Sequence, residues 1–437
     1  MGQGRGAPQR RPGVGRRDDT LLAAVTDIIT RLAVEAMDAH DPLAGCRQGF
    51  ALPPGVIYLD GNSLGALPAT TPARVARVVE DWGRDLIGGW NRHDWIGWPR
   101  RVGDRVARLV GAQLGEVIVA DSTSVNVFKL LAAALDLNRG RRVILSEADN
   151  FPTDLHIAHG LRRLLADAVE VRTVDAAAVP AALDGDVAVL MLTHVNYRTG
   201  AMHDMAALTA AAHAAGALAL WDLSHSAGAM PLTLNEASVD LAVGGGYKFL
   251  NGGPGAPAYL FVAERWRGRI QPALSGWMGH ARPFDFATAY EPAAGIERFL
   301  VGTPPVLSLA ALDAGVEMFD RVDLRLVRAK SIALGGLFRR LVEQECRGLG
   351  LRLVSPADPE HCGSQVSYAH PDGYAIVQAL VAGGVIPDFR APDVLRFGFA
   401  PLYVRHVDVF DAVASLRRIM VTRTYDEPRF RVRARVT

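Results

Sequence analysis

The chain has 437 residues, too many for one compact core at about 100–200 residues per domain, so we expect a large domain with a smaller one. Hydrophobic residues make up 49% and charged residues 21% of the chain, which excludes a mainly disordered or fibrous protein. The 47 Lys and Arg against 46 Asp and Glu give a formal charge of +1. No global charge therefore favours nucleic acid or a lipid surface as a partner.

Cysteine usage and apolar runs indicate the compartment. The three cysteines, Cys46, Cys346 and Cys362, are too few and too scattered for a disulfide framework or a paired metal site. No apolar run approaches the roughly 18–20 residues that a membrane-spanning helix needs. The N-terminus also lacks the apolar core of a signal peptide. We expect a cytoplasmic protein with neither a membrane nor a nucleic-acid partner.

The first residues are expected to form a basic tail, 1–18, because residues 1–17 hold five arginines and no acid and bury too little apolar surface to fold. An RNA-contacting arm is the alternative, but no aromatic residue is interleaved for base stacking. Asp19 and Thr20 then cap a helix that ends before Asp41. The segment 19–60 is expected to pack on the small domain, and a second helix starts at Thr71.

From residue 116 onward, short apolar runs alternate with helical stretches. This alternation predicts an α/β fold with a mostly parallel sheet covered by helices on both faces. We assign residues 61–305 to this large domain, 306–425 to a smaller α+β domain and 426–437 to a tail. The segments are EVIVA, VFKLLAAAL, RRVILSE, LHIAHGLRRLL, DVAVLMLTHV, MAALTAAAHAAG, ALALWDL and VDLAVGGG.

Polar residues that follow the predicted strands are candidates for a ligand site, because ligands of such sheets bind beyond the carboxyl ends of the strands. The run ALALWDL ends in Asp222 and is followed by His225, and VDLAVGGG leads to Tyr247 and Lys248. A lysine can form a Schiff base with the aldehyde of pyridoxal phosphate (PLP), and a carboxylate can keep its pyridine nitrogen protonated. The spacing alone also fits two solvated charges.

Two further segments are candidates for contacts to such a cofactor. Residues 121–124 (DSTS) place hydroxyl groups between a strand and a helix N-terminus, where a phosphate would bind, although a capped helix alone explains the pattern. FPTD follows the strand RRVILSE, so Phe151 could stack on a ring and Asp154 could accept a hydrogen bond. As an isolated motif, FPTD is a turn.

Signals for other chemistries are weak. His156 and His159 are three residues apart on a predicted helix, but no third ligand lies at metal spacing and no HExxH motif occurs. We therefore expect no metal site. The sequence also lacks a GxSxG nucleophile elbow and a Walker phosphate loop.

Eight motifs in chain order resemble those of kynureninase, over a region that runs from about Asp41 to about Tyr425. Kynureninases are fold-type-I PLP enzymes, similar to class V aminotransferases, and act as homodimers. They hydrolyse the Cβ–Cγ bond of L-kynurenine to anthranilate and L-alanine in tryptophan catabolism, which leads towards NAD biosynthesis, and many accept 3-hydroxykynurenine. The motifs are YLDGNSLG at Tyr58, DSTSVN at Asp121, FPTD at Phe151, WDLSHSAG at Trp221, YKFLNGGPG at Tyr247, GWMGH at Gly276, GTPP at Gly302 and LRFGFAPLY at Leu395.

The resemblance implies roles for the residues of these motifs. Lys248 would bind PLP covalently and move protons, Asp222 would pair with the pyridine nitrogen, and His225 would lie beside the ring. Tyr247 would touch the phosphate and protonate the carbanion left by cleavage. The remaining cofactor contacts implied are Thr123, Ser124, Phe151, Asp154, Thr193, Trp277 and Thr303.

For the substrate, the resemblance implies that Arg396 clamps the α-carboxylate with two hydrogen bonds and that Asn62 assists it. Trp277 and Thr303 are expected to reach the site from the partner subunit. Thr303 stands where family members carry either Thr or Asn, which leaves the preference for the 3-hydroxylated substrate open. His93, within GGWNRHDWIGWP, could meet the aniline ring; the three tryptophans of this segment fit an aryl pocket, the core or a dimer contact.

Two other functions remain open. A cysteine desulfurase or selenocysteine lyase would use similar Asp, His and Lys residues but needs a mobile nucleophilic cysteine, and neither Cys346 nor Cys362 is predicted on a flexible loop. A non-catalytic regulator with a PLP-type fold could bind a partner through its basic arm. The intact central motifs speak against it.

Overall fold

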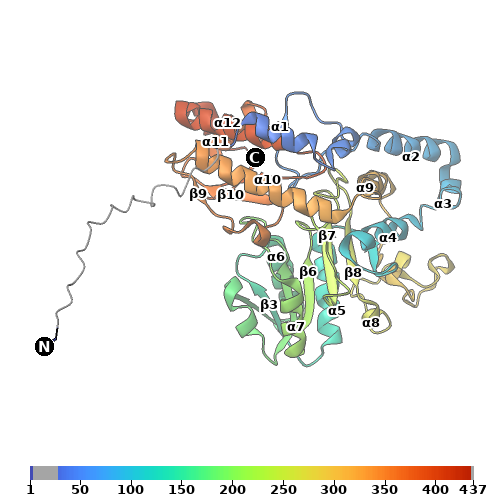
Figure 1. Ribbon diagram of the computed structural model, residues 1–437. Helices are drawn as coiled ribbons and strands as arrows, with labels where there is room; N and C mark the ends of the chain where they lie inside the picture. Colours follow the sequence, from blue (N-terminus) through green and yellow to red (C-terminus); the bar gives the residue numbers. More distant parts are fainter. Residues whose placement is uncertain (3–27, 435–437) are drawn as a thin grey trace.

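The computed structural model describes residues 1–2 and 28–434 (Figure 1). Residues 3–18 of the predicted basic tail and the predicted helix cap at Asp19 lie outside the described residues. Helix α1 (Arg31–Ala39) begins after Thr30, whose hydroxyl accepts a hydrogen bond from the Ala33 N–H at 3.3 Å. The prediction of one unbroken helix is therefore wrong at residues 28–30, because Thr30 provides a local N-cap.

Seven strands form the central sheet in the order β2-β8-β7-β6-β5-β3-β4. All run in the same direction except β8, which is antiparallel to both of its neighbours. The mostly parallel sheet predicted from the sequence is confirmed. The strands are β2 (Val117–Val119), β3 (Val143–Glu147), β4 (Glu170–Val174), β5 (Val187–Thr193), β6 (Leu218–Asp222), β7 (Leu241–Gly245) and β8 (Ala258–Val262).

Helices cover both faces of this sheet, as predicted. Alternate residues of a strand point to opposite faces, so Val189 of β5 packs with α5 (Thr123–Leu137) and α6 (Pro152–Leu164). The next residue, Leu190, belongs to the hydrophobic cluster of the other face, which also contains residues of α7 (Met205–Ala214) and α4 (Trp98–Val110). Burial on both faces explains why β5, β6 and β7 are continuous apolar runs.

A second sheet, entirely antiparallel, has the order β12-β13-β10-β9 and carries three helices (Figure 1). The short strand β1 pairs in parallel with β11, and α1 packs against α12, so the N-terminal segment joins this C-terminal part. The elements are β1 (Ile57–Tyr58), β9 (Arg352–Leu353), β10 (Gln365–Ala369), β11 (Val385–Ile386), β12 (Asp388–Arg390), β13 (Val394–Gly398), α10 (Leu324–Glu345), α11 (Gly373–Ala382) and α12 (His406–Thr422).

The segments at the two limits of the predicted small domain pack against other parts of the chain. Helix α9 (Val306–Glu317) packs against α2 (Thr71–Asp85) and α4. After α12, the Tyr374 hydroxyl donates a hydrogen bond to the Val432 carbonyl at 3.0 Å. The chain after residue 425 therefore lies on α11. The domain limits inferred from the sequence stay predictions.

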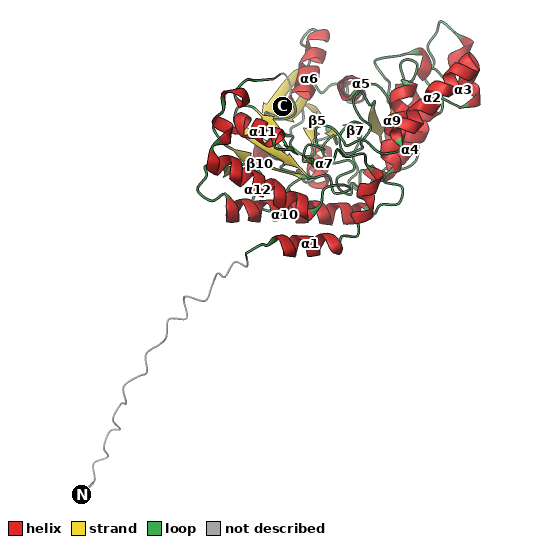
Figure 2. Cartoon of the chain, turned by 90° about the horizontal axis from the view of Figure 1, so that it is seen from above, coloured by secondary structure: helices red, strands yellow, loops and turns green. Residues whose placement is uncertain are grey.

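An arm formed by α2, η3 (Leu86–Gly88) and α3 (Gly89–Arg92) extends away from both sheets (Figures 1 and 2). Helix α2 begins at Thr71 as predicted, with a proline in its first turn. Val78 of this helix is buried, whereas Trp82 is 56% exposed. The arm thus presents apolar side chains that the described chain leaves uncovered.

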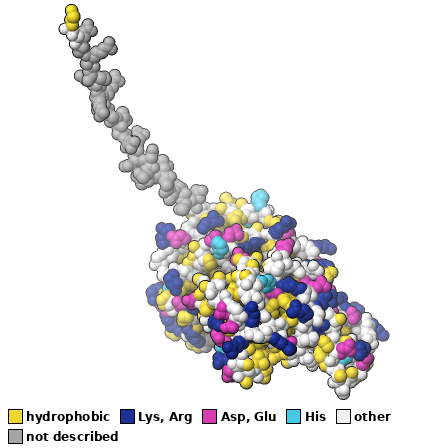
Figure 3. All heavy atoms as spheres, turned by 90° about the horizontal axis from the view of Figure 1, so that it is seen from below, with side chains coloured by type: hydrophobic (Ala, Val, Ile, Leu, Met, Phe, Trp, Pro, Cys, Tyr) yellow, Lys and Arg dark blue, Asp and Glu magenta, His cyan; other side chains and the backbone are white. Residues whose placement is uncertain are grey.

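Charged side chains of both signs are mixed on the face of the molecule that Figure 3 shows. This mixture agrees with the formal charge of +1. Within residues 28–434, no helix combines the length and the apolar character needed to cross a membrane.

Candidate active site

The candidate site begins at the carboxyl ends of three adjacent strands. Strands β7, β6 and β5 are neighbours in the sheet, and Thr193 at the end of β5 pairs in register with Asp222 at the end of β6. His225 follows β6, and Lys248 follows β7 after a short glycine-rich turn. The parallel topology therefore gathers side chains that lie up to 55 residues apart (248 − 193) at one edge.

Lys248 lies against a histidine. Its Nζ is 2.9 Å from Nε2 of His225, and both side chains are buried. Burial lowers the pKa of Lys248 to about 8, an effect that Asp222 opposes and that Arg396 and Arg390 strengthen. Burial, followed by the charge of Lys248, also holds the pKa of His225 well below its ordinary value. His225 is therefore neutral at neutral pH and can accept the lysine hydrogen bond.

The amine of Lys248 has a different kind of partner from the amines of the only other lysines of the chain, Lys129 and Lys330. Lys129 forms an ion pair with Asp121 and donates a hydrogen bond to the Phe299 carbonyl at 2.6 Å. Lys330 lies 2.7 Å from a carboxylate oxygen of Asp41 and donates to a backbone carbonyl. Only Lys248 has an amine that is not held by a salt bridge within 4.0 Å among the described residues, as a covalent role requires.

Two carboxyl groups face each other next to this lysine. Asp222 accepts a hydrogen bond from the Ser224 N–H at 2.7 Å, whereas both carboxyl oxygens of Asp154, in the first turn of α6, are buried without a hydrogen-bond partner among the described residues. Burial, together with the charge of Asp222, raises the pKa of Asp154 well above its ordinary value. Unsatisfied buried oxygens are costly, and the protonated pyridine nitrogen of PLP would supply the missing charge and donor.

A phosphate can be placed at the N-terminus of α5. Ser122 caps this 15-residue helix, and its hydroxyl accepts a hydrogen bond from the Val125 N–H at 3.3 Å. Thr123 and Ser124 follow in the first turn, where the helix dipole favours an anion. A Cβ atom added to Gly245 would lie 3.1 Å from the Tyr247 ring and 3.5 Å from the Thr123 hydroxyl. The absence of a side chain at Gly245 thus lets Tyr247 and the Thr123 hydroxyl lie close to the backbone, beside the helix N-terminus at which a phosphate would bind.

Aromatic side chains flank the lysine. Nζ of Lys248 lies 5.6 Å from the ring centroid of Phe151 and 5.7 Å from that of Tyr247. Phe151 in turn meets Tyr197 edge to face, with 5.2 Å between the ring centroids. A flat ring bound at Lys248 would therefore lie within reach of Phe151, as the sequence predicts.

Arg396 reaches the site from the second sheet. Its Nε donates to Asp388 Oδ1 at 2.8 Å, its Nη1 to the Tyr197 carbonyl at 2.6 Å and its Nη2 to the Ser63 hydroxyl at 2.6 Å. Its positive charge lowers the pKa of Lys248. The side of the guanidinium that carries Nε is thus occupied by Asp388, so a bidentate grip on a carboxylate has to use the Nη1 and Nη2 side.

Asn62, the other predicted substrate contact, is fully buried. Its Nδ2 donates to Gln365 Oε1 at 3.2 Å, and its Oδ1 has no partner among the described residues. Gln365 also donates to the Tyr197 carbonyl that Arg396 uses, at 3.1 Å. Asn62 and Arg396 therefore belong to one hydrogen-bonded group.

Trp277 and Thr303 are not brought to Lys248 within the chain. They line a hollow of about 390 Å³ together with Ile87 and Trp90 of the arm, and Trp277 stays 42% exposed. No hydrogen bond, ion pair or aromatic contact of the described residues joins them to Lys248 or Asp222.

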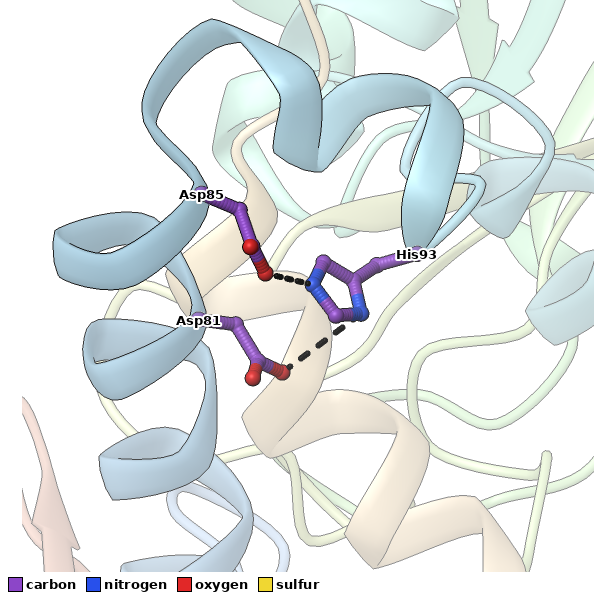
Figure 4. Close-up of side chains that lie close together, drawn as sticks. All are labelled: Asp81, Asp85 and His93. Carbon is purple, nitrogen blue, oxygen red and sulfur yellow. Dashed lines mark hydrogen bonds and ion pairs between the residues drawn. The ribbon is translucent and has the colours of Figure 1, made fainter.

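His93 also lies apart from Lys248, in the arm (Figure 4). Its Nε2 is 2.8 Å from Asp85 Oδ2, and its Nδ1 is 3.7 Å from Asp81 Oδ2. Within the described chain these three residues are the one group with metal-ligand spacing. Arg84 contacts both carboxylates, and the hydrogen bond from His93 lowers the pKa of Asp85. Cations already balance the carboxylates, so the geometry favours an ion-pair cluster that ties α3 to α2.

Several residues of the site were not found from the sequence. Asp60 and Ser63 lie inside the quoted motif YLDGNSLG, and Tyr197 follows β5; all three contact or approach Arg396. Asp388 could not be found by spacing, because it meets Arg396 only through the antiparallel register of β12 and β13.

Comparisons with known proteins show which family the chain is similar to. The family model of the kynureninase C-terminal domain matches residues 327–416. A kynureninase from Burkholderia pseudomallei (strain 1106a) is 52% identical over 414 residues, which cover 93% of this chain and 100% of that relative. A kynureninase from Deinococcus radiodurans is 54% identical over 393 residues, or 89% of this chain and 95% of the relative.

Solved structures resemble the chain at lower identity. The apo cysteine desulfurase of Thermococcus onnurineus NA1 has a TM-score of 0.73 at 17% identity and covers 87% of this chain and 98% of its own. A C-DES mutant with glycine covalently linked to its PLP cofactor has a TM-score of 0.72 at 19% identity, with coverages of 85% and 98%. This likeness confirms the predicted fold, that of fold-type-I PLP enzymes.

Proposed function

The chain belongs to the kynureninase family, and we propose that it hydrolyses the Cβ–Cγ bond of L-kynurenine, and of 3-hydroxykynurenine, with PLP as its cofactor. The products are anthranilate or 3-hydroxyanthranilate and L-alanine. The observation that carries the proposal is the buried Lys248 amine, which lies 2.9 Å from His225 and is influenced by Asp222 and Arg396. When bound, PLP supplies an electron sink for charge that develops on the substrate.

Lys248 acts as the base of the reaction. Its pKa of about 8 leaves a substantial fraction of the amine neutral near neutral pH, so Nζ can take the substrate α-proton. When PLP is bound, Asp222 at the end of β6 would pair with its pyridine nitrogen, and Asp154 would lie beside that contact. His225 positions Nζ through their hydrogen bond.

Tyr247 supplies a proton to the substrate Cβ after the bond to the carbonyl breaks. Burial, followed by the charge of Asp222, raises the pKa of its phenol above the ordinary value. The hydroxyl therefore stays protonated at neutral pH and is available as a donor. Its place between Thr123 and Lys248 fits the second role predicted for it, contact to the phosphate.

Arg396 and Asn62 orient the substrate by its α-carboxylate. A guanidinium is suited to this task because its planar donors match a carboxylate. Phe151 would lie against the cofactor ring, and Thr193, Thr123 and Ser124 would complete its polar contacts. Holding both reactants in this way replaces an encounter in solution with a fixed geometry.

The enzyme acts as a homodimer in this proposal, with Trp277 and Thr303 of each subunit at the other subunit's site. Two observations support it: no contact among the described residues joins either residue to Lys248, and the adjoining arm exposes apolar side chains. Ile87 is 83% and Leu86 65% exposed, and with Trp82 they line a hollow beside Trp90. Large exposed apolar patches mark interfaces. His93 would meet the substrate only from such a neighbouring arm.

Neither competing function has the same support. A desulfurase needs a reactive thiolate, but Cys346 and Cys362 are buried, and burial raises the pKa of Cys346 to about 11 and that of Cys362 above its ordinary value. A non-catalytic regulator does not require the buried charges around Lys248. We place the enzyme in the cytoplasm and in tryptophan catabolism, on a route towards NAD biosynthesis, without nucleic-acid or membrane partners.

Product analysis tests the proposal. Purified protein loaded with PLP is incubated separately with L-kynurenine, 3-hydroxykynurenine and L-cysteine, and the products are identified by mass spectrometry. We expect equal amounts of L-alanine and of the matching anthranilate, and no sulfide from cysteine. Sulfide release without cleavage of kynurenine would contradict the proposal.

A further inference from the structure

A second pair of carboxyl groups, the buried Asp388 and the partly buried Asp60, lies behind Arg396. Asp388 of β12 pairs with the guanidinium, and Nε of Arg396 is 2.8 Å from its Oδ1. Asp60 follows β1, and its Oδ1 lies 3.9 Å from Nη2 of Arg396 without a hydrogen-bond partner among the described residues. Ser63 donates to Asp388 Oδ2 at 2.7 Å and accepts from Arg396. The two carboxyl groups thus share one guanidinium.

The net charge of this cluster depends on a single proton. Arg390 lies 2.8 Å from Asp388 Oδ2, so the cluster contains two guanidinium groups and two carboxyl groups. With both carboxyl groups ionised, the net charge is zero. With one of them protonated, the cluster keeps one positive charge, and the substrate α-carboxylate is the anion that would neutralise it.

Asp60 is the member of the pair that holds the proton. Burial, followed by the charge of Asp388, raises its pKa to about 7, although Arg396 opposes the effect. The two arginines outweigh burial at Asp388 and lower its pKa below the ordinary value. A buried carboxyl group near a second, ionised one is expected to stay protonated in this way.

The other titratable groups around Asp60 do not change charge in the same range. Tyr58 of β1 and Tyr403 of the segment after β13 face it, and burial raises the pKa of both phenols above the ordinary value. Arg390 and Arg396 remain charged throughout. Loss of one proton from Asp60 is therefore the change of charge that the cluster undergoes near neutral pH.

We propose that Asp60 and Asp388 hold one proton between them and that this proton sets the net charge with which Arg396 receives the substrate α-carboxylate. The inference rests on the proposed function for the identity of that anion. Asp60 is a positioning residue, because it acts through Arg396. Affinity for the carboxylate is full below about pH 7 and decreases as pH rises, by up to about tenfold per pH unit if only the protonated form binds.

The test compares the wild-type holoenzyme with Asp60→Asn, which keeps the shape of the side chain but cannot ionise. The KM for L-kynurenine and the dissociation constant of L-alanine are measured at several pH values on both sides of neutrality. We expect both constants to rise with pH in the wild type and to stay nearly flat in Asp60→Asn. Asp393→Asn is the matched control: Asp393, near β12 and β13, pairs with Arg198 at 3.7 Å, and its removal should leave the wild-type profile.

Difference infrared spectroscopy gives a readout that does not depend on turnover. The difference between the spectra in mildly acidic and in alkaline solution should contain the carbonyl stretch of a protonated carboxyl group in the wild type, and this component should be absent from the same difference in Asp60→Asn. Asp154, whose pKa is also raised, contributes equally to both proteins, so only the component that the substitution removes is assigned to Asp60. A flat wild-type KM, or a band that survives the substitution, would overturn the inference even if kynurenine is cleaved. If kynurenine is not cleaved while the band behaves as expected, the proposed function fails and the shared proton stands. If Asp60→Asn fails to fold, the pH dependence of KM and of the infrared band in the wild type tests the inference.

Discussion

Nζ of Lys248 lies 2.9 Å from Nε2 of His225, so the amine meets a neutral imidazole where the other two lysines of the chain meet carboxylates. A carboxylate at this distance would stabilise the protonated form of the lysine amine by its negative charge. Burial instead lowers the pKa of Lys248, and the charges of Arg396 and Arg390 act in the same direction, which prepares the amine for covalent chemistry.

This relationship predicts how the apoenzyme takes up PLP. Only a neutral amine attacks an aldehyde, so the rate of loading should rise with pH and level off above about 8, the pKa of Lys248. An ordinary lysine would show a rise that continues beyond about pH 10. Stopped-flow absorbance of PLP mixed with apoenzyme measures the profile. A rate that still climbs well above pH 9 would show that the amine is not perturbed.

Tyr247→Phe should remove the proton donor together with one of several contacts to the phosphate. We expect kcat and kcat/KM to fall together by about 10²-fold, because general acid catalysis acts only in the transition state, while PLP stays bound. Tyr374→Phe is the control: Tyr374, on α11, bonds to the chain near Val432, and its loss should leave kinetics unchanged. A change confined to KM would assign Tyr247 a binding role only.

Arg396→Lys should weaken substrate binding without loss of PLP. A lysine keeps the charge but cannot bond to Asp388, Ser63 and the Tyr197 carbonyl together, as Arg396 does. The expected rise in KM is about 10- to 100-fold. Steady-state kinetics and the cofactor absorbance measure the two effects. Arg352→Lys, at a side chain that is 72% exposed, serves as control. Unchanged kinetics in Arg396→Lys would place the carboxylate elsewhere.

The dimer proposal predicts complementation between two inactive variants. Lys248→Ala removes the amine and Trp277→Ala removes the residue proposed to come from the partner, so a hybrid dimer contains one site with both residues intact. Co-refolded variants should regain up to about a quarter of wild-type activity, because half of the dimers are hybrids with one intact site of two. Each variant alone is the control. Absence of any gain, with hybrids verified by native mass spectrometry, would place Trp277 outside the neighbouring site.

The central strands could be predicted from the sequence because parallel strands buried on both faces leave continuous apolar runs such as Val187–Thr193. Strand β4 (Glu170–Val174) was missed because its charged, partly exposed residues lack such a run. Strand β8 (Ala258–Val262) was missed although it is fully buried. Its reversed direction depends on pairing with β2 and β7, which no local pattern records.

In the candidate site, too, residues marked by a local sequence pattern could be predicted, whereas residues brought together by strand pairing could not. Asp222 and Lys248 could be found because each follows a recognisable strand. The partners of Arg396 could not, since Asp388 and Asp60 reach it through strand register and through the pairing of β1 with β11. The places of Trp277 and Thr303 relative to Lys248 depend on a second subunit in our proposal, and a sequence holds no distances between subunits.

The measurement that tests the central claim most directly follows cofactor and product in one cuvette. The holoenzyme is mixed with L-kynurenine while cofactor absorbance and anthranilate fluorescence are recorded; a second sample is reduced with borohydride and digested, and the pyridoxyl label is located by mass spectrometry. The account predicts a change in the absorbance band with growing fluorescence, and a label on Lys248 but not on Lys129 or Lys330. A label on either of those lysines, or an absorbance band with no anthranilate, would contradict it.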